Sequence, residues 1–206
     1  MTVTAIEPKR NGLSVLYIDG EFALKLDTEV LLSHRVDVGC DIDDEKLKAV
    51  IDASNIKRAK DKAMWLISYR DQAKRELIDK VAKDSSRDAA IKAVERLEEL
   101  GLVNDERFAQ RYAQELLNTK RMSPSGAVRK LVEKGIDREL ARDTLEQLDC
   151  DIDENIKAII NKKYSKNLCD EKGRRRCVNA LMRLGYSYSD IKSALSQYTE
   201  IDYSEY

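Results

Sequence analysis

The stretch Val128-Arg-Lys-Leu-Val-Glu-Lys-Gly-Ile-Asp137 has a similar counterpart 50 residues later, Val178-Asn-Ala-Leu-Met-Arg-Leu-Gly-Tyr-Ser187. A valine, a leucine, a glycine, an apolar residue and a helix-capping residue coincide in the two copies. The glycine is the residue that commonly ends a helix in the left-handed conformation, and the Asp or Ser that follows starts the next helix. The pattern therefore predicts a helix, a tight turn and a second helix at both places.

A fainter third copy lies 51 residues before the first, with Asp84 in place of the glycine. Its apolar and capping residues take equivalent places at Leu77, Ser86, Ala90 and Val94. A further amphipathic segment, with apolar residues spaced for one buried helix face, precedes each copy. We therefore predict three units of three short helices each, in residues 55–103, 104–149 and 150–206. Small units of this kind bury little surface alone, so neighbours should stack as in repeat proteins.

The first 54 residues form a separate region in which strands are expected. Leu13–Ile18 and Glu21–Leu26 flank Asp19-Gly20, a dipeptide typical of a two-residue hairpin turn because both positions take positive φ. In that hairpin Tyr17 is expected to face Phe22, and Val15 to face Leu24.

A second turn of the same kind, Asn11-Gly12, lets residues 2–7 pair as a first strand, with Pro8 at a sheet edge. Asp27 and Asp43 can each cap a helix that follows. The fold class we predict is mainly α, with a small N-terminal antiparallel β-meander.

Composition excludes several classes of protein. Of the 206 residues, 42% are hydrophobic and 36% charged, and only 8 Gly and 2 Pro interrupt the chain, which excludes an all-β sandwich. No window approaches the roughly 18 apolar residues of a membrane span. The N-terminus lacks the basic flank and apolar stretch of a secretory signal, so we expect a cytoplasmic protein that contacts no membrane.

Cofactor and metal sites are not expected. The cysteines are Cys40, Cys150, Cys169 and Cys177, none in a Cys-x-x-Cys pair, and the one histidine is His34. Zinc sites usually bring paired ligands together, so we expect no metal, no cofactor and reduced thiols.

No motif for catalysis is present, so we expect a protein that is not an enzyme. There is no glycine-rich phosphate loop and no nucleophile elbow. Acidic groups at residues 43–45, 98–99 and 105–106 are expected to favour helix starts or solvated faces. Trp65, beside an apolar stripe, is expected in the core.

Basic residues carry the functional signal. The net charge of −1 hides an acidic N-terminal region, with 6 basic and 11 acidic residues in 1–54, and a more basic segment, with 12 and 9 in 55–103. Basic side chains gather around residues 123–126, and a second cluster occupies the corresponding place 50 residues later. These are Lys120, Arg121, Arg129 and Lys130, and then Arg174, Arg175, Arg176 and Arg183. Such clusters suit a phosphate backbone or the acidic face of a partner.

The segment Leu100-Gly-Leu-Val-Asn-Asp-Glu-Arg-Phe-Ala-Gln-Arg-Tyr112 resembles a signature of the RecX family of bacterial recombination regulators. Residues 125–136, which end in Lys-Gly-Ile, are similar to a small helix of that family, and residues 17–22 look like the N-terminal hairpin of its longer members. The resemblance runs from about residue 13 to 198. Within the signature, Phe108 and Leu100 are expected in the core.

What the resemblance implies is an elongated, curved array of three helical units that binds the RecA recombinase or its filament on single-stranded DNA and mostly inhibits it. Residues carried over as the partner-facing surface of the middle unit are Arg111, Arg129, Lys130, Lys134, Arg138 and Arg142. We expect a monomer. Direct contact with single-stranded DNA stays open, as do two alternatives, a stand-alone DNA-binding helical module and a general helical scaffold.

Overall fold

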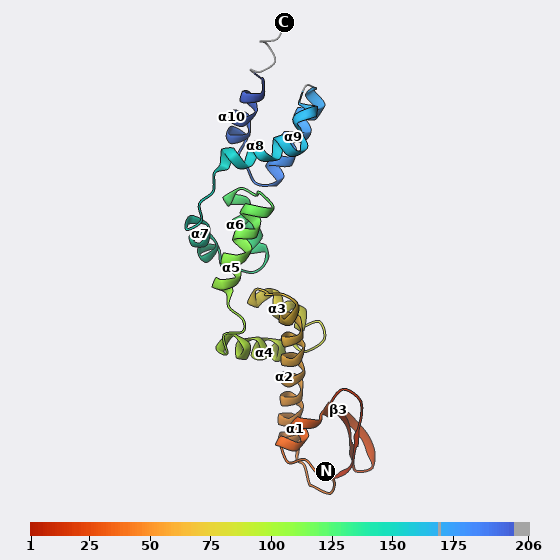
Figure 1. The fold of residues 1–206 in the computed structure, drawn as a ribbon. Helices are drawn as coiled ribbons and strands as arrows, with labels where there is room; N and C mark the ends of the chain where they lie inside the picture. Colours follow the sequence, from red (N-terminus) through yellow and green to blue (C-terminus); the bar gives the residue numbers. More distant parts are fainter. Residues whose placement is uncertain (169, 200–206) are drawn as a thin grey trace. The chain divides into compact units, whose positions relative to one another are not determined.

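The computed structural model describes residues 1–168 and 170–199, so Cys169 and residues 200–206, the end of the predicted third helical unit, lie outside the described residues. The chain divides into two compact units, Met1–Asn104 and one that begins at Asp105. The described part is mainly helical with one three-stranded antiparallel sheet, which confirms the predicted fold class (Figure 1).

The sheet has the order β1-β2-β3, from β1 (Val3–Pro8), β2 (Leu13–Ile18) and β3 (Glu21–Asp27). Both predicted turns are confirmed, because Asn11-Gly12 and Asp19-Gly20 all have positive φ. Pro8 lies on the edge strand β1, as expected.

The predicted pairing of Tyr17 with Phe22 is confirmed, but that of Val15 with Leu24 is wrong. A bulge between the Leu16 and Tyr17 pairs makes Leu16 the partner of Leu24, and Val15 pairs with Lys25. A bulge inserts one unpaired residue and bends the strand, and sequence alternation alone does not reveal it. It lets the fully buried Leu16 join the core.

Two helices cover the sheet, α1 (Thr28–Ser33) and α2 (Asp44–Tyr69), capped as expected by Asp27 and Asp43. The core here unites strand residues with helix residues, and includes Val3, Leu16, Leu26, Val30, Leu31, Val36, Ile42 and Val50. The buried residue Asp27 connects the sheet, α1 and α2. Its backbone N–H donates to Ser54 Oγ at 2.8 Å, and Lys57 Nζ donates to its carboxylate at 3.1 Å.

The 26-residue helix α2 runs without a break past residue 54, the predicted boundary between the N-terminal region and the first helical unit. Its packing changes there instead. Val50 belongs to the core under the sheet, whereas Ala59 and Ala63 belong to a second core with α3 (Lys74–Val81) and α4 (Arg87–Glu99). One helix thus contributes to two cores in succession. Figure 1 shows α2 running from α1 and the sheet at one end to α3 at the other.

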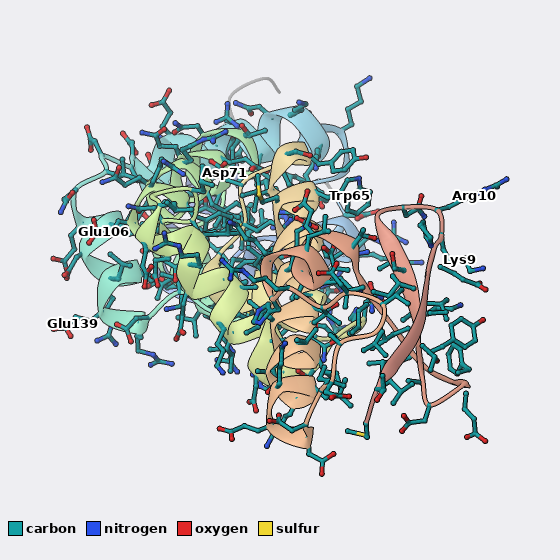
Figure 2. All side chains as sticks on the ribbon, turned by 90° about the horizontal axis from the view of Figure 1, so that it is seen from below. Lys9, Arg10, Trp65, Asp71, Glu106 and Glu139 are labelled. Atoms are coloured by element: carbon teal, nitrogen blue, oxygen red, sulfur yellow. The ribbon has the colours of Figure 1, made fainter. Side chains whose placement is uncertain are left out.

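The prediction that Trp65 is a core residue is wrong. The side chain, labelled in Figure 2, is 52% exposed on α2. It packs edge-to-face on Tyr69, with ring centroids 4.8 Å apart. Position 65 follows the buried position 63 by two residues, so at about 100° per residue it lies well off the buried face. Leu100 is also exposed, because it caps α4 and Leu97 is buried in its place, whereas Phe108 is buried as expected.

The second compact unit begins with α5 (Asp105–Gln114), which continues into a π-helical turn, η1 (Glu115–Thr119). α6 (Pro124–Glu133) and α7 (Arg138–Glu146) follow. Then come α8 (Ile152–Lys163), a short 3-10 turn η2 (Ser165–Asn167), α9 (Glu171–Arg183) and α10 (Tyr188–Thr199). Gly135 and Gly185 both have φ of 95°, and Asp137 and Ser187 bond the first amides of the next helices, as the repeat predicts.

The start of α6 is fastened to the turn between α9 and α10. The Ser123 N–H donates to the Leu184 carbonyl at 3.1 Å, and Ser125 Oγ donates to the Gly185 carbonyl at 2.9 Å. The Tyr186 hydroxyl, in a buried side chain, donates to the Arg121 carbonyl at 2.7 Å. These hydrogen bonds join the two repeated segments of the unit directly, about 60 residues apart in sequence.

Because Tyr186 is buried, we expect the stability of this junction to fall at alkaline pH. Burial raises the pKa of Tyr186 to about 12, against about 10 for an exposed tyrosine. Between these values the unfolded chain loses the proton and the folded chain keeps it, so stability is full below pH 10 and falls as pH rises toward 12. We expect a loss of about 2–3 kcal/mol over this window.

The measurement is urea unfolding of the parent and of Tyr186→Phe between pH 8 and 11.5. The variant should start less stable, because the Arg121 carbonyl loses its donor. It should then lose less stability with rising pH than the parent does. Parallel pH curves for the two proteins would contradict this assignment.

Candidate partner-binding surface

A groove of about 460 Å³ lies between α6 and α7 in the second compact unit. α6 supplies residues that recur at helical spacing along one face, and α7 supplies two arginines one turn apart. Its lining consists of Ser125, Val128, Arg129, Val132, Glu133, Arg138 and Arg142. The groove therefore has an apolar floor of two half-buried valines and a rim of three exposed arginines.

Local sequence fixes the two helices that form this groove. Ser123 caps α6 through the Gly126 N–H, with Pro124 in the first turn, and Gly135 permits the left-handed turn that ends the segment. Asp137 then accepts from the Glu139 and Leu140 N–H groups, and these bonds lower the pKa of its carboxyl. Arg138 and Arg142 thus lie in the first two turns of a helix whose N-terminus is capped.

The three arginines of the groove are available to a ligand. Within the described residues, no hydrogen bond or ion pair connects Arg129, Arg138 or Arg142 to another side chain. Glu133, the one acid among the described lining residues, accepts from Lys130 at 2.6 Å. A guanidinium carries five donors in a planar fork that matches a carboxylate or phosphate. The groove is therefore suited to an anionic group next to an apolar one.

Other predicted residues make structural contacts. Lys120 Nζ lies 2.9 Å from Glu115 Oε1 and 5.0 Å from the centre of the Tyr112 ring, and the hydrogen bond to Glu115 raises its pKa. Arg121 adopts a φ of 49° and donates to Asn155 Oδ1 at 3.1 Å. Arg121 therefore helps to hold the junction, Lys120 makes contacts local to α5 and η1, and the groove lining includes neither.

The remaining predicted residues are not part of the groove lining, although Lys130 pairs with Glu133 of that lining. Arg111 is exposed on α5, and Lys130 and Lys134 are half-buried on or just after α6. On α9, Arg175, Arg176 and Arg183 are exposed, and Arg174 lines a second groove between α9 and α10. The structure thus gathers three of the twelve predicted residues at one site.

Acidic residues take the roles expected of helix starts and surface pairs. Asp43 caps α2, and Asp105 lies in the first turn of α5. Glu98 pairs with Lys74 at 2.6 Å. Among the described residues, no three potential ligands of the His, Cys, Asp and Glu types come together for a metal, and Cys40, Cys150 and Cys177 are free thiols.

The segment that carries the groove matches a known family. Residues 104–145 match the family model described as RecX, second three-helix domain. Full-length relatives extend the match: a "Regulatory protein RecX" of Clostridioides difficile is 26% identical over 97% of this chain and 97% of its own length. One of Clostridium tetani is 29% identical over 95% and 93%. The chain is thus similar to RecX proteins over nearly its whole length.

Solved structures of RecX proteins have the same fold. A structure described as that of regulatory protein RecX superposes with a TM-score of 0.67 at 22% identity, over 95% of this chain and 98% of the other. RecX from Lactobacillus salivarius gives a TM-score of 0.58 at 24% identity over 72% of this chain. Within the part of this chain that the structure covers, no helix has the length and apolarity needed to cross a membrane.

Proposed function

We propose that the chain binds the RecA recombinase, or its filament on single-stranded DNA, and modulates its recombinase, ATPase and co-protease activities, mostly by inhibition. The observation that carries this proposal is the α6–α7 groove, with three arginines free of carboxylates among the described residues, in the segment that matches the RecX domain. RecA binding is what the RecX resemblance implies, and the groove offers it a surface of suitable chemistry.

In this proposal the chain acts by occupying a surface of RecA in the cytoplasm, without a chemical step of its own. Arg129, Arg138 and Arg142 pair with carboxylates of the partner, and the two valines cover an apolar side chain beside them. Buried arginine-carboxylate pairs beside an apolar contact are typical of the residues that dominate interface affinity.

We further propose that the helical part acts as three consecutive repeats, with bounds 55–103, 104–149 and 150–206, after an N-terminal region of residues 1–54. Support comes from the separate cores of the first and third repeats, around Ala90 and Ile160, and from the shared turn chemistry of the second and third.

Light scattering first checks that the purified chain is a monomer, as expected. The chain is then titrated into RecA on single-stranded DNA while the rate of ATP hydrolysis is measured. The proposal predicts a fall in the hydrolysis rate at amounts comparable to those of RecA. An unchanged rate, together with no binding to RecA in a pull-down, would refute it.

A second candidate function, direct DNA binding, is favoured by the exposed arginines of α9. Lys172, Arg176 and Arg183 recur at helical spacing on its exposed side. Contacts between cations and phosphates release counterions, so this function predicts affinity for bare single-stranded DNA that falls steeply with salt. Absent or salt-insensitive binding would reject it.

A further inference from the structure

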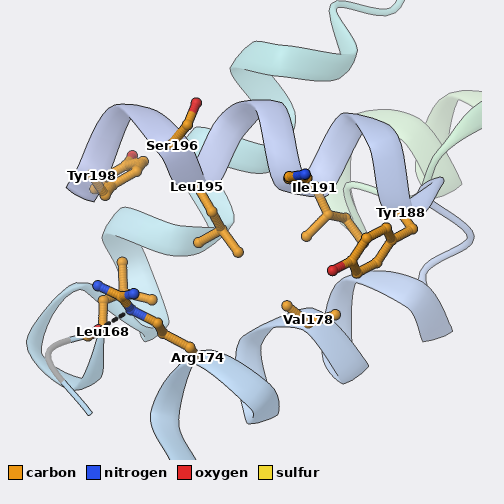
Figure 3. A pocket seen from close by; sticks show the side chains of 9 residues that line it. Leu168, Arg174, Val178, Tyr188, Ile191, Leu195, Ser196 and Tyr198 are labelled. Atoms are coloured by element: carbon orange, nitrogen blue, oxygen red, sulfur yellow. Dashed lines mark hydrogen bonds between the residues drawn. The ribbon is translucent and has the colours of Figure 1, made fainter. Parts of the chain in front are cut away.

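A second groove, of about 340 Å³, lies between α9 and α10 (Figure 3). The residues that line it come from both helices and from Leu168, which precedes α9. They are Leu168, Arg174, Val178, Tyr188, Ile191, Lys192, Leu195, Ser196 and Tyr198. Among the described residues the lining contains two cations and no acid, and its volume is within the range of sites that hold small ligands or single side chains.

The middle of this groove is aliphatic and its ends are polar. Figure 3 shows Val178 on α9 across from Ile191 and Leu195 on α10, with Tyr188 toward one end and Arg174 and Tyr198 toward the other. Tyr188 and Tyr198 are ten residues apart on one helix, or about 15 Å. The two phenol rings therefore cannot act together as a stacking platform for one base.

Arg174 is held in place at its end of the groove. Its Nε donates to the Leu168 carbonyl at 2.7 Å, and no contact with a described residue takes up its terminal nitrogens. A cation whose conformation is already fixed loses less entropy when it binds a carboxylate. Lys192, exposed on α10, adds a second positive charge.

The groove takes the same place in its helix pair as the α6–α7 groove. At the repeat offset of 50, Val178 corresponds to Val128, Lys192 to Arg142 and Tyr188 to Arg138. Both grooves thus combine a valine floor with a cation one turn into the following helix. The substitution of Tyr188 for an arginine makes the second groove less basic and more apolar.

We infer that the α9–α10 groove binds a short acidic segment of the protein partner, with one aliphatic or aromatic side chain between carboxylates. The apolar side chain lies on Val178, Ile191 and Leu195, and the carboxylates pair with Arg174 and Lys192. Charge complementarity supports this occupant, because the charged residues of the lining within residues 168 and 170–199 are both cations. Nucleic acid fits less well, because it needs rows of cations and adjacent aromatic faces. The inference rests on the proposed function in that the segment belongs to RecA.

The experiment uses the full chain and a fluorescein-labelled probe peptide, Glu-Glu-Leu-Phe-Glu-Glu, followed by fluorescence anisotropy. The parent should bind it, and Lys192→Glu should weaken binding by about tenfold or more, because attraction becomes repulsion. The matched control, Lys163→Glu, reverses an exposed lysine on α8 outside the groove and should bind within about twofold of the parent. A peptide with lysines in place of the glutamates should not bind.

The inference would be overturned if the acidic peptide did not bind, or if Lys192→Glu and Lys163→Glu lost peptide affinity equally. Binding of an oligothymidine probe is measured in the same way. Loss of oligothymidine binding in Lys192→Glu, with peptide binding unaffected, would also overturn it. Thermal melting of both variants reports whether they fold. The RecA titration separates the two proposals. Inhibition of RecA without peptide binding removes only the groove assignment. Peptide binding without an effect on RecA removes the proposed function and the assignment of the segment to RecA, and leaves the groove as a site for acidic segments.

Discussion

Gly126→Ala should lower the free energy of unfolding of the second compact unit by about 3 kcal/mol or more. A methyl group on Gly126 would lie 2.2 Å from the Leu184 carbonyl oxygen, which belongs to the backbone of the α9–α10 turn. Backbone cannot rotate away as a flexible side chain can, so α6 and the turn would have to separate. Separation would also break the hydrogen bond from Ser123 to Leu184.

Gly185→Ala should be similarly costly, because its methyl group would lie 2.6 Å from Gly126 Cα and its φ is +95°. The matched control is Gly101→Ala, whose φ is +70° but whose methyl group would meet nothing within 4 Å. The control should therefore lose only the stability that left-handed backbone strain costs, about 1–2 kcal/mol. Urea denaturation provides the comparison. Equal destabilisation by Gly185→Ala and Gly101→Ala would show that the two glycines do not meet as described.

The double variant Arg138→Glu with Arg142→Glu should raise the concentration needed for half-inhibition of RecA by about tenfold to a hundredfold. Both arginines line the α6–α7 groove, and reversing them places four carboxylate oxygens where the proposed partner presents its own. Neither arginine supports the fold through a described partner, so the melting temperature should stay close to that of the parent.

The matched control for this variant is Arg75→Glu with Lys92→Glu, an arginine and a lysine that are both exposed, on α3 and α4. Its half-inhibition concentration should remain within about threefold of the parent value. The assay is ATP hydrolysis by RecA on single-stranded DNA at two salt concentrations. If both double variants lose inhibition equally, net charge governs the interaction and the groove does not.

Local signals predicted much of the fold. The turn dipeptides Asn11-Gly12 and Asp19-Gly20 and the caps Asp27, Asp43 and Asp137 act through backbone geometry within a few residues, so the sequence reveals them directly. The bulge near Tyr17 and the exposure of Trp65 depend on which neighbours the chain folds against. No local pattern carries that information.

The candidate site was predicted only in part for the same reason. Arg129, Arg138 and Arg142 were identified by the RecX resemblance, and the structure brings them to one groove. Lys120 and Arg121 look equally available in the sequence, but contacts with Glu115 and Asn155 hold them. The α9–α10 groove went unnoticed because its apolar residues read as ordinary core positions. A signal was present, since the repeat offset maps Val178 and Lys192 onto groove residues of the earlier copy.

The central claim is that the arginine-lined groove between α6 and α7 meets RecA. Hydrogen–deuterium exchange of the chain, alone and with RecA filaments on single-stranded DNA, tests it most directly. Binding of RecA at this groove should slow exchange in residues 124–146, which form both walls of the groove. Slower exchange confined to the sheet and α1, with residues 124–146 unchanged, would contradict it.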